Sequence, residues 1–571
     1  MNQTDLHQSA APGFRTWSEP LDVVVVGAGF AGIYMQYALR EAGFQSVVFE
    51  AGSDVGGTWY WNRYPGARCD VDSLDYSYKF SEEIQREWRW SERYAAQDEI
   101  LRYFHFVVDR LDLRRDIQLN TRVTASHYDE ASNLWTVRTD TGDVVRARFV
   151  VMATGNLSTA NVPAIPGRER FGGEQYHTGN WPKEPVSFEG KRVAVIGTGS
   201  SGVQAVTEIS RRAAQLTVFQ RTANFCLPAD VPTLRDKERQ NYLDNLEQMR
   251  EIARHSQYGT PYSQALLLHR PALEDDVETR NRIMQERWDM GGAALVRSWN
   301  DLLTNEEANR PVAEFVRAKI REIVKDPATA AALSPTDHPI GTKRLCLDTG
   351  YYEAFNKPHV SLVDLKSEPI EEIVETGVRT SKATYAFDVL VFATGFDAMT
   401  GTLLRIDFQG RQGLRLTEAW AAGPRTYLGV MTNGFPNLFL VTGPGSPSIT
   451  GCVVVSIEQH VEWITDCLIH LRNNRLNRIE PALDAQDAWV DHVNALAAST
   501  LLPKANSWYM GANIPGKPRV FMPYIGGIGT YRRECNEIVE AGYKGFNMSA
   551  VRNESDEVFE IGYTDSKASA A

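Results

Sequence analysis

Paired cysteines, long hydrophobic runs and an excess of positive charge are absent from this sequence of 571 residues. The six cysteines are scattered, with no C-x-x-C pair and no cluster with histidine at metal-binding spacing, which argues against a disulfide reductase and against a metal site. No run of about eighteen consecutive apolar residues, the length of a membrane-spanning helix, occurs in the chain. Residues 1–20 are polar and lack the apolar core of a signal peptide, so we expect a cytoplasmic protein without a membrane segment.

The charge balance and composition indicate which ligands and which type of protein to expect. The formal net charge is −12, which gives no general electrostatic basis for binding nucleic acid, although a local basic pocket for a phosphate group is compatible with it. Hydrophobic residues make up 43% and charged residues 23%, as in ordinary globular proteins, and the length predicts several domains. We expect small-molecule ligands and no obligate protein partner.

One glycine-rich pattern occurs twice in the chain. In each copy an apolar, strand-like run enters a G-x-G-x-x-G turn, at 27–32 and at 197–202, and continues into helix-favouring sequence. The glycines of this pattern let the backbone approach a pyrophosphate, which then binds the amide groups and the positive dipole end of the next helix. We therefore predict that the chain binds two dinucleotides.

The residue that ends the second strand of each unit indicates which nucleotide is bound. Glu50 offers a carboxylate to the ribose hydroxyls of an unphosphorylated adenosine, whereas Arg221 and Thr222 offer a cation and a hydroxyl where a 2′-phosphate would lie. The pattern predicts FAD at the first unit and NADPH at the second. A purely structural role for both turns does not account for Arg221 at the position of the acidic residue.

Two apolar runs that end in Ala-Thr-Gly, at 149–155 and 389–395, resemble the returning strands of the two-dinucleotide flavoprotein fold. They bracket the second unit, so we expect an α/β fold with two dinucleotide-binding (Rossmann-like) domains, of which the FAD domain is discontinuous. Charged, helix-favouring sequence predicts an inserted helical subdomain. The expected parts are an N-terminal extension at 1–20, the FAD-binding domain at 21–156 and 390–550, the NADPH-binding domain at 157–228 and 333–389, the helical insertion at 229–332, and a C-terminal tail at 551–571 that is expected to be disordered after Tyr563.

A longer motif stands just before the second glycine turn. It matches F-x-G-x-x-x-H-x-x-x-W-P, and a second pattern, with a tryptophan, a Tyr-Pro pair and an aspartate, matches residues 56–59, 64–66 and Asp70. With both motifs the chain resembles the Baeyer–Villiger monooxygenases, a family of class B flavoprotein monooxygenases, and in particular the phenylacetone monooxygenase type. The resemblance runs from Val23 to about Phe546, and the defined positions of the first motif are Phe171, Gly173, His177, Trp181 and Pro182.

The resemblance implies an enzyme that uses FAD, NADPH and O₂ to insert one oxygen atom beside a ketone carbonyl. The product is an ester or lactone, formed through a flavin peroxide and a Criegee intermediate, and the same peroxide, if protonated, would also oxidise sulfides. One alternative is an N- or S-hydroxylating flavin monooxygenase, which would lack the Trp181-Pro182 ending and the Lys343-Arg344 pair. Another is a flavoprotein that senses or carries NADPH without oxygen chemistry.

Arg344 and Asp70 match the family's catalytic arginine and the carboxylate that orients it. The resemblance implies that Arg344 holds the peroxyanion and then the Criegee intermediate, because a guanidinium keeps its charge at any working pH and donates several hydrogen bonds. The alternatives are a surface ion pair for Arg344 and an Asx-turn role for Asp70.

The resemblance also implies the residues that contact the cofactors. For FAD these are Gly27, Gly29, Phe30, Ala31, Gly32, Glu50, Gly57, Thr58, Trp59, Asp70 and Tyr76. For NADPH they are Thr198, Gly199, Ser200, Ser201, Arg221, Thr222, Lys343, Arg344 and Trp508. Trp508 belongs to a segment that matches the family's mobile loop, and its alternative role is that of a core aromatic residue.

The remaining expectations concern the hinge and the substrate. The fingerprint histidine, His177, is expected at the hinge between the domains as a hydrogen-bonded structural residue and not as a general base. The substrate pocket is expected to include Ser448, Ile449, Thr450 and Cys452. Cys452 is interpreted as a small pocket or core residue and not as a nucleophile.

Overall fold

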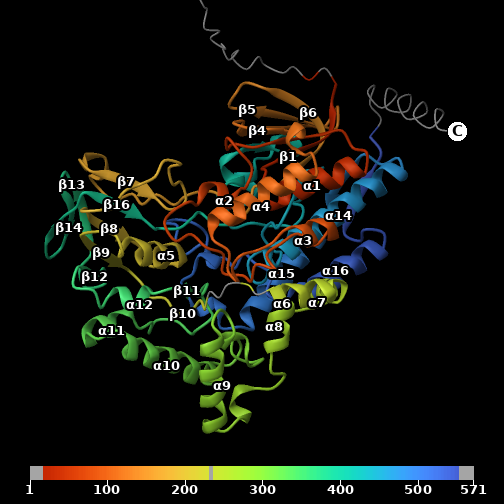
Figure 1. Cartoon of the computed structure of the whole chain (residues 1–571). Coiled ribbons are helices and arrows are strands. Elements are labelled where there is room, and N and C mark those ends of the chain that lie inside the picture. Colours follow the sequence, from red (N-terminus) through yellow and green to blue (C-terminus); the bar gives the residue numbers. More distant parts are fainter. Residues whose placement is uncertain (1–16, 18, 231–233, 235, 552–571) are drawn as a thin grey trace, which may run out of the picture.

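The computed structural model describes residues 17, 19–230, 234 and 236–551. Almost all of the expected N-terminal extension and C-terminal tail, including the predicted disorder of the tail, lies outside these residues. The described chain forms two large sheets, each with helices packed on it, and a group of further helices that lies against both (Figure 1).

The first sheet has eight strands and contains the first glycine turn. Its order is β17-β4-β5-β6-β1-β2-β3, and β18 pairs with β6 beside this path. β1 pairs in parallel with β2 and β6, and its apolar residues are buried on both faces, as in parallel sheets covered by helices. The strands are β1 (Leu21–Val26), β2 (Ser46–Phe49), β3 (Ile117–Gln118), β4 (Val123–Asp129), β5 (Leu134–Thr139), β6 (Val144–Met152), β17 (Asp407–Gln409) and β18 (Leu438–Leu440).

The second sheet is parallel throughout and has the order β12-β9-β8-β16-β7. Its strands are β7 (Glu174–His177), β8 (Arg192–Ile196), β9 (Gln215–Gln220), β12 (Val360–Asp364) and β16 (Val389–Phe392). The expected boundary after residue 389 was wrong by a few residues, because it cuts β16, which pairs with β7 and β8. The chain therefore returns to the first sheet after Phe392, where β17 and β18 add to it.

Three small sheets complete the strand pairing in the described chain. They consist of an antiparallel set of β13 (Ile370–Val374), β14 (Gly377–Thr380) and β15 (Thr384–Ala386), a parallel pair of β10 (Cys226–Pro228) and β11 (Cys346–Asp348), and an antiparallel pair of β19 (Arg478–Pro481) and β20 (Phe546–Ser549). The β10–β11 pair joins the two ends of the helical insertion, since Cys226 and Cys346 are partners in its register.

The helices outside the insertion cover the two sheets. Buried side chains of α1 and α14 form the main core of the FAD-binding side, where the two helices pack on each other. These helices are α1 (Phe30–Glu41), α2 (Thr58–Trp61), α3 (Glu82–Glu87), α4 (Gln97–Arg110), α5 (Ser200–Ile209), α12 (Tyr351–Ala354), α13 (Leu416–Ala419), α14 (Val453–Asn473), α15 (Leu483–Ala498) and α16 (Ile528–Glu540). The short 3₁₀ helices are η1 (Arg114–Asp116), η2 (Arg168–Arg170), η3 (Ala272–Glu274), η4 (Leu295–Arg297), η5 (Leu403–Arg405), η6 (Arg411–Gly413), η7 (Leu502–Lys504) and η8 (Trp508–Met510).

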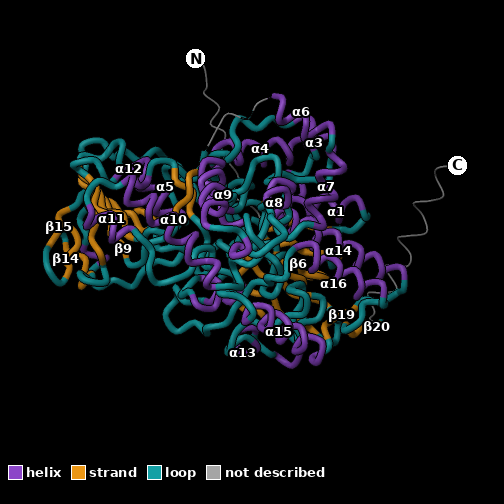
Figure 2. The backbone as a smooth tube through the Cα atoms, turned by 90° about the horizontal axis from the view of Figure 1, so that it is seen from below, coloured by secondary structure: helices purple, strands orange, loops and turns teal. Residues whose placement is uncertain are grey.

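The predicted insertion is helical, but it does not form one separate body. α7 packs on α16 of the FAD-binding side, whereas α10 packs on α12 of the NADPH-binding side, as both backbone views show (Figures 1 and 2). The insertion therefore spans both domains. Its helices are α6 (Asp236–Asp244), α7 (Leu246–His255), α8 (Pro261–Leu266), α9 (Val277–Met290), α10 (Glu306–Ile323) and α11 (Pro327–Leu333).

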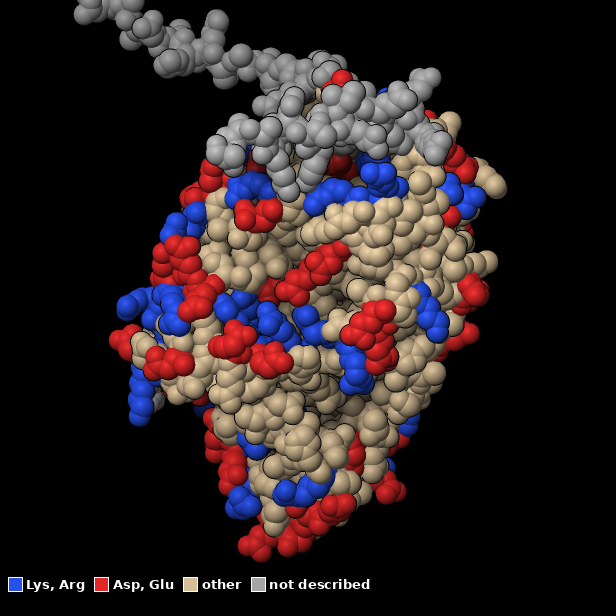
Figure 3. Space-filling model, turned by 90° about the vertical axis from the view of Figure 1, so that its right-hand side faces the viewer, with Lys and Arg blue, Asp and Glu red and all other residues tan. Residues whose placement is uncertain are grey.

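The surface charge and the length of the helices test whether the chain has the features of a nucleic-acid-binding or membrane-spanning protein. Acidic and basic side chains are interspersed over the face seen in Figure 3, without the broad basic stripe of a nucleic-acid interface. Among the described residues, no helix combines the length and the apolar character needed to cross a membrane.

Candidate active site

The first glycine turn joins β1 to α1, and two of its positions, Gly27 and Gly32, have no room for a side chain. Gly27 has φ of +104°, and a Cβ at Gly32 would lie only 1.7 Å from the carbonyl oxygen of Gly27. α1 has Gly29 at its N-cap and no side-chain cap, so its first amide groups remain available to a pyrophosphate. This geometry fits the cradle expected for FAD.

Glu50 directly follows β2 and lies beside this turn. Its carboxylate accepts hydrogen bonds from the backbone amides of Ala28 at 2.7 Å and Gly52 at 2.6 Å. Burial raises the pKa of Glu50, while the two amide contacts act in the opposite direction. The carboxylate is thus held beside the turn with acceptor capacity left for ribose hydroxyls.

The loop after β2 brings the other expected FAD residues to the turn. A Cβ at Gly57 would lie 2.9 Å from the Cα of Gly29, so the two backbones are in direct contact. Trp59 Nε1 donates to the Tyr76 hydroxyl at 3.1 Å, and the Tyr76 ring lies edge-on to Phe30 at 5.1 Å. Ala31 is buried in the same core, and Thr58 begins α2.

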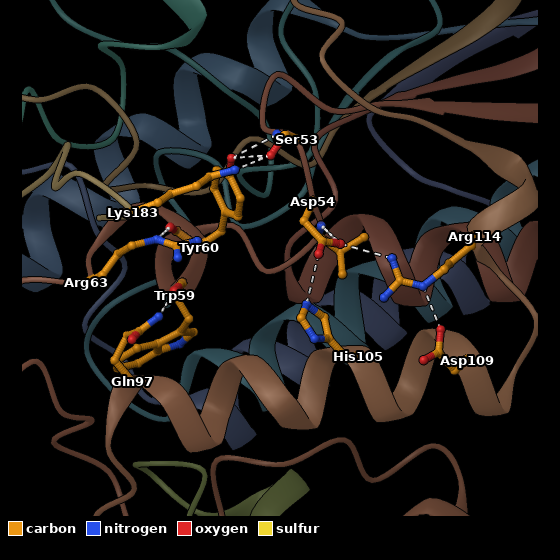
Figure 4. Close-up of polar contacts among 11 residues, drawn as sticks. Ser53, Asp54, Trp59, Tyr60, Arg63, Gln97, His105, Asp109, Arg114 and Lys183 are labelled. Carbon is orange, nitrogen blue, oxygen red and sulfur yellow. Dashed lines mark hydrogen bonds and ion pairs between the residues drawn. The ribbon is translucent and has the colours of Figure 1, made fainter. Parts of the chain in front are cut away.

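Figure 4 shows how this loop is fixed to its neighbours. Asp54 accepts a hydrogen bond from Arg114 at 3.0 Å and pairs with His105 of α4 at 3.2 Å. On the other side, Lys183 follows the fingerprint motif, donates to the Ser53 hydroxyl and lies over the Tyr60 ring, 5.1 Å from its centroid. The fingerprint segment therefore contacts the FAD-side loop directly.

The second glycine turn repeats this geometry between β8 and α5. Gly197 has φ of +112°, and a Cβ at Gly202 would lie 2.2 Å from the carbonyl oxygen of Gly197. A Cβ at Gly199 would meet nothing within 4 Å, so the turn faces open space above the uncapped start of α5. A second pyrophosphate fits there.

The hydroxyl groups of this turn are partly engaged. Thr198 Oγ1 donates to the carbonyl oxygen of Thr222 at 2.8 Å and so ties the turn to the end of β9. The Ser200 hydroxyl lies 3.7 Å from the Cys346 thiol, and Ser201 lies beside the Tyr64 hydroxyl. Thr198 thus stabilises the turn through its side chain, and its carbonyl oxygen accepts a hydrogen bond from Asn224 Nδ2 at 2.7 Å.

Positive charges converge at the far end of this unit. Burial lowers the pKa of Lys343, and the nearby charges of Arg221 and Lys366 lower it further, against the opposite effect of Asp337. Lys366 pairs with Asp337 at 3.0 Å. Lys366 has no motif around it, so sequence reasoning missed it. Lys343, Arg221 and Lys366 repel one another, and a bound phosphate group would offset this repulsion.

The central ion pair of the site lies between the two units. Arg344 donates two parallel hydrogen bonds to Asp70, from Nε at 2.7 Å and from Nη2 at 2.6 Å, and its Nη1 donates to the carbonyl oxygen of Ile449 at 2.9 Å. The side chains of Arg344 and Asp70 are 31% and 27% exposed. The pair is therefore neither sealed in a core nor spread on the outer surface.

Electrostatics keeps this pair ionised. Burial raises the pKa of Asp70, but Arg344 outweighs that effect, so the pKa lies below its usual value. Burial lowers the pKa of Arg344, yet Asp70 raises it by more. A fixed, partly exposed guanidinium can stabilise negative charge on an oxygen atom of a ligand.

The expected substrate segment lies beside Arg344. Ser448 and Cys452 are buried, and Thr450 Oγ1 donates to the carbonyl oxygen of Tyr524 at 3.1 Å. Ile449 packs in an apolar cluster with Trp508 and Tyr509, whose rings meet edge-on at 4.5 Å. Trp508 thus has core contacts at this edge of the site, and both of its expected roles stay open.

The fingerprint residues lie where the two sheets are connected. His177 Nε2 is 3.2 Å from the carbonyl oxygen of Asn161 and 3.2 Å from the Thr394 hydroxyl, on the two segments that connect the sheets. Its Nδ1 accepts from the Gly179 amide at 2.9 Å, and burial lowers the pKa of His177, so both effects favour the neutral ring. Phe171 and Trp181 are buried, Gly173 leaves no room for a Cβ, and Pro182 precedes Lys183.

The six cysteines of the sequence all lie within the described chain, where each is buried and unpaired. Burial raises the pKa of Cys452, whose thiol donates to the carbonyl oxygen of Asp75 at 3.4 Å. A thiol of raised pKa is a poor nucleophile at neutral pH.

Known proteins resemble this chain over nearly its whole length. Residues 24–254 match the family model described as pyridine nucleotide-disulphide oxidoreductase. The acetone monooxygenase (methyl acetate-forming) of Gordonia sp. is 39% identical, over 93% of this chain and 99% of that protein. A Baeyer–Villiger monooxygenase of Pseudooceanicola batsensis is 40% identical over 93% and 96%. The phenazine N-monooxygenase of Lysobacter antibioticus is 41% identical over 92% and 96%.

Solved structures agree with these relatives. An oxidised steroid monooxygenase bound to NADP is 49% identical, with a TM-score of 0.88 over 93% of this chain and 100% of that one. OTEMO in complex with FAD and NADP is 39% identical, with a TM-score of 0.90 over 94% and 100%. The chain belongs to the Baeyer–Villiger monooxygenases.

Proposed function

We propose that this chain is an FAD-containing, NADPH- and O₂-dependent monooxygenase that converts ketones to esters or lactones. The observation that carries the proposal is the bidentate Arg344–Asp70 pair between two dinucleotide cradles. The family relationship supports it, since relatives of similar identity are ketone monooxygenases by name. A cytoplasmic location, with the ketone and O₂ as the only partners, remains part of the proposal.

The residues of the two cradles fit the cofactors. The first turn, Glu50 and the Trp59–Tyr76 pair would hold FAD, and the second turn with Arg221, Thr222 and Lys343 would hold NADPH. Bound FAD supplies, after reduction by NADPH and reaction with O₂, the oxygen atom that is inserted beside the carbonyl. Side chains of the protein would orient the ligands, exclude water and stabilise negative charge.

Arg344 acts on the oxygen that carries negative charge while the new carbon–oxygen bond forms. Its guanidinium donates hydrogen bonds to that oxygen, and Asp70 fixes the plane of the guanidinium through two contacts. The apolar cluster around Ile449 and Trp508 limits the access of water, which strengthens this interaction. His177 would couple the movement of the two domains to turnover, because it contacts both connecting segments.

Oxygen uptake with NADPH and a panel of linear, cyclic, aryl and steroid ketones tests the proposal. We expect ketone-dependent NADPH oxidation and an ester or lactone product, with sulfoxidation as a side activity. A parallel panel of amines and nitrogen heteroaromatic compounds tests the N-hydroxylating alternative, which one relative exemplifies by name, and N-oxides formed without any ester from the ketones would favour it. NADPH binding without any oxygen uptake would contradict both enzymatic functions.

The basic cluster predicts a preference for NADPH over NADH. Loss of a charge-assisted contact to the 2′-phosphate is worth roughly 1.5–3 kcal/mol, or about ten- to a hundredfold in affinity. Arg221→Ala should raise the Michaelis constant for NADPH by that factor and leave NADH nearly unchanged, in steady-state assays with both cofactors. Arg170→Ala, an exposed arginine paired with Glu372, is the control. Equal losses with NADPH and NADH would refute the assignment.

Flavin binding is predicted to be tight but non-covalent. The residues around the first turn would hold FAD through backbone amides, hydrogen bonds and packing. None of them matches a residue that forms a covalent bond to flavin in the family. Denaturation of the purified yellow protein should release FAD into the filtrate, identified by chromatography. FMN in the filtrate, or flavin retained on the denatured chain, would be the contrary result.

A further inference from the structure

A second arginine, Arg297, faces the same site from the helical insertion. It ends η4 and donates from Nη1 to the Ser263 hydroxyl. Its guanidinium carbon lies 4.5 Å from the centroid of the Tyr258 ring. Within the described part of the chain, no carboxylate oxygen lies within 4.0 Å of a guanidinium nitrogen of Arg297, so the residue forms no ion pair there.

The position of Arg297 follows from the segment between the two arginines. Arg344 donates to the carbonyl oxygen of Ile449, and three residues later the Cys452 amide donates to the carbonyl oxygen of Tyr258 at 2.8 Å. Arg297 lies on the ring of that same tyrosine. The expected substrate segment therefore has Arg344 at one end and the Tyr258–Arg297 contact at the other.

Among the described residues Arg297 has no carboxylate in direct ion-pair contact, which distinguishes it from the neighbouring arginines. Arg344 is paired with Asp70, and Arg93, which stacks on Tyr262 in the same region, is paired with Asp72 at 3.1 Å. Burial lowers the pKa of Arg297, and the charge of Arg344 lowers it as well, although Tyr258, Asp70 and Tyr94 act in the opposite direction. A buried guanidinium without an anion is unfavourable, and an incoming anion would stabilise it.

The donors of Arg297 are available to such an anion. Nε and Nη2 of Arg297 have no hydrogen-bond partner among the residues described. Neither nitrogen is fully buried. Both nitrogens therefore reach accessible space. The carboxylate whose charge acts on Arg297 is that of Asp70, and both of its oxygen atoms already accept hydrogen bonds from Arg344.

We propose that Arg297 binds a carboxylate of the substrate, so that the preferred substrates of this enzyme are ketones that also carry a carboxylate. The keto group would lie at Arg344 and the carboxylate at Arg297, with the chain between them along residues 449–452. The inference rests on the proposed ketone oxidation and adds the substrate class to it. Planar, two-pronged donation makes arginine the suitable residue for a carboxylate.

The first test uses the wild-type holoenzyme with methyl ketones of the form CH₃CO(CH₂)ₙCOO⁻ and their methyl esters, over a series of chain lengths. Each pair has the same reacting ketone and differs only in the charge at the far end. We expect at least one chain length at which kcat/KM for the carboxylate exceeds that for the methyl ester about tenfold or more. No preference at any length, or a preference for the esters throughout, would overturn the proposal.

The second test uses Arg297→Gln and Arg297→Lys at the best chain length. Arg297→Gln should lose about tenfold or more in kcat/KM for the carboxylate and stay within about twofold for its methyl ester, whereas Arg297→Lys should keep part of the preference. Arg282→Gln, an exposed arginine of the insertion paired with Glu286, should behave as wild type. Equal losses on carboxylate and ester in Arg297→Gln would contradict the assignment.

A binding measurement separates this inference from the proposed function. Alkanoates of matching length, which lack the keto group, should bind the FAD-loaded wild-type enzyme in calorimetric titrations and bind Arg297→Gln at least about tenfold more weakly. If no ketone, charged or neutral, yields an ester, the proposed function fails while this titration still decides on the carboxylate site. If Arg297→Gln does not retain flavin, Arg297→Lys and the wild-type series give the decision. Undetectable alkanoate binding to the wild type would count against the site.

Discussion

Arg344→Ala should bind both nucleotides and be reduced by NADPH, yet form almost no ester. Hydride transfer to the flavin does not require a cation for a charged oxygen, whereas the oxygenation step does. Removal of one such donor typically lowers the rate by about a hundred- to a thousandfold. Stopped-flow absorbance of the flavin measures the reduction step, and product analysis after ketone turnover measures the oxygenation step.

The two readouts for Arg344→Ala have distinct consequences. Ester formation at the wild-type rate would place the arginine in the scaffold, where it holds Asp70 and the carbonyl oxygen of Ile449. Failure of flavin reduction would instead assign Arg344 to placement of the nicotinamide. Arg344→Lys serves as the companion variant, because it keeps a charge and loses the bidentate contact to Asp70.

Asp70→Asn should lower both the rate and the stability, because it leaves Arg344 without its counter-ion. We expect about a hundredfold loss of ketone oxygenation, milder than for Arg344→Ala. Breaking a buried ion pair is strongly destabilising, and for a pair that is about one third exposed we expect about 2 kcal/mol in the free energy of unfolding. Denaturant titration at pH 7 measures this change.

The pH dependence of that stability has a definite sign. The pKa of Asp70 in the folded chain lies below its usual value, so its contribution is complete above about pH 3.9, the ordinary pKa of aspartate, and is lost as the pH falls through the folded-state pKa. The difference between wild type and Asp70→Asn should therefore shrink in acid. A difference that stays constant down to pH 3 would show that the charge of Asp70 is not what stabilises the fold.

Local sequence determines the parts of the site that could be predicted. The glycine turns depend on φ angles and close backbone contacts within a few residues, so the motif alone indicates their geometry, and Glu50 follows from the length of the unit. The pairing of Asp70 with Arg344 joins residues that are far apart in the sequence, and it was expected only through the resemblance to a family.

Other features depend on tertiary packing and left no signal in the sequence. Lys366 and Arg297 have no motif around them, and only the fold brings Lys366 near Lys343 and Arg297 onto the Tyr258 ring. The boundary after residue 389 was misplaced, because an apolar run does not reveal which sheet it joins. The insertion was expected as one body, but helix propensity does not indicate which partner each helix packs against.

Turnover under ¹⁸O₂ tests the central claim most directly. Purified enzyme, NADPH and a ketone that it oxidises should yield an ester with a single ¹⁸O atom, located in the ring or chain oxygen and not in the carbonyl, together with one equivalent of NADP⁺ and labelled water. Mass spectrometry of the ester and its hydrolysis fragments gives the position of the label. An ester without ¹⁸O, or NADPH oxidation that yields only hydrogen peroxide with every ketone, would contradict the account.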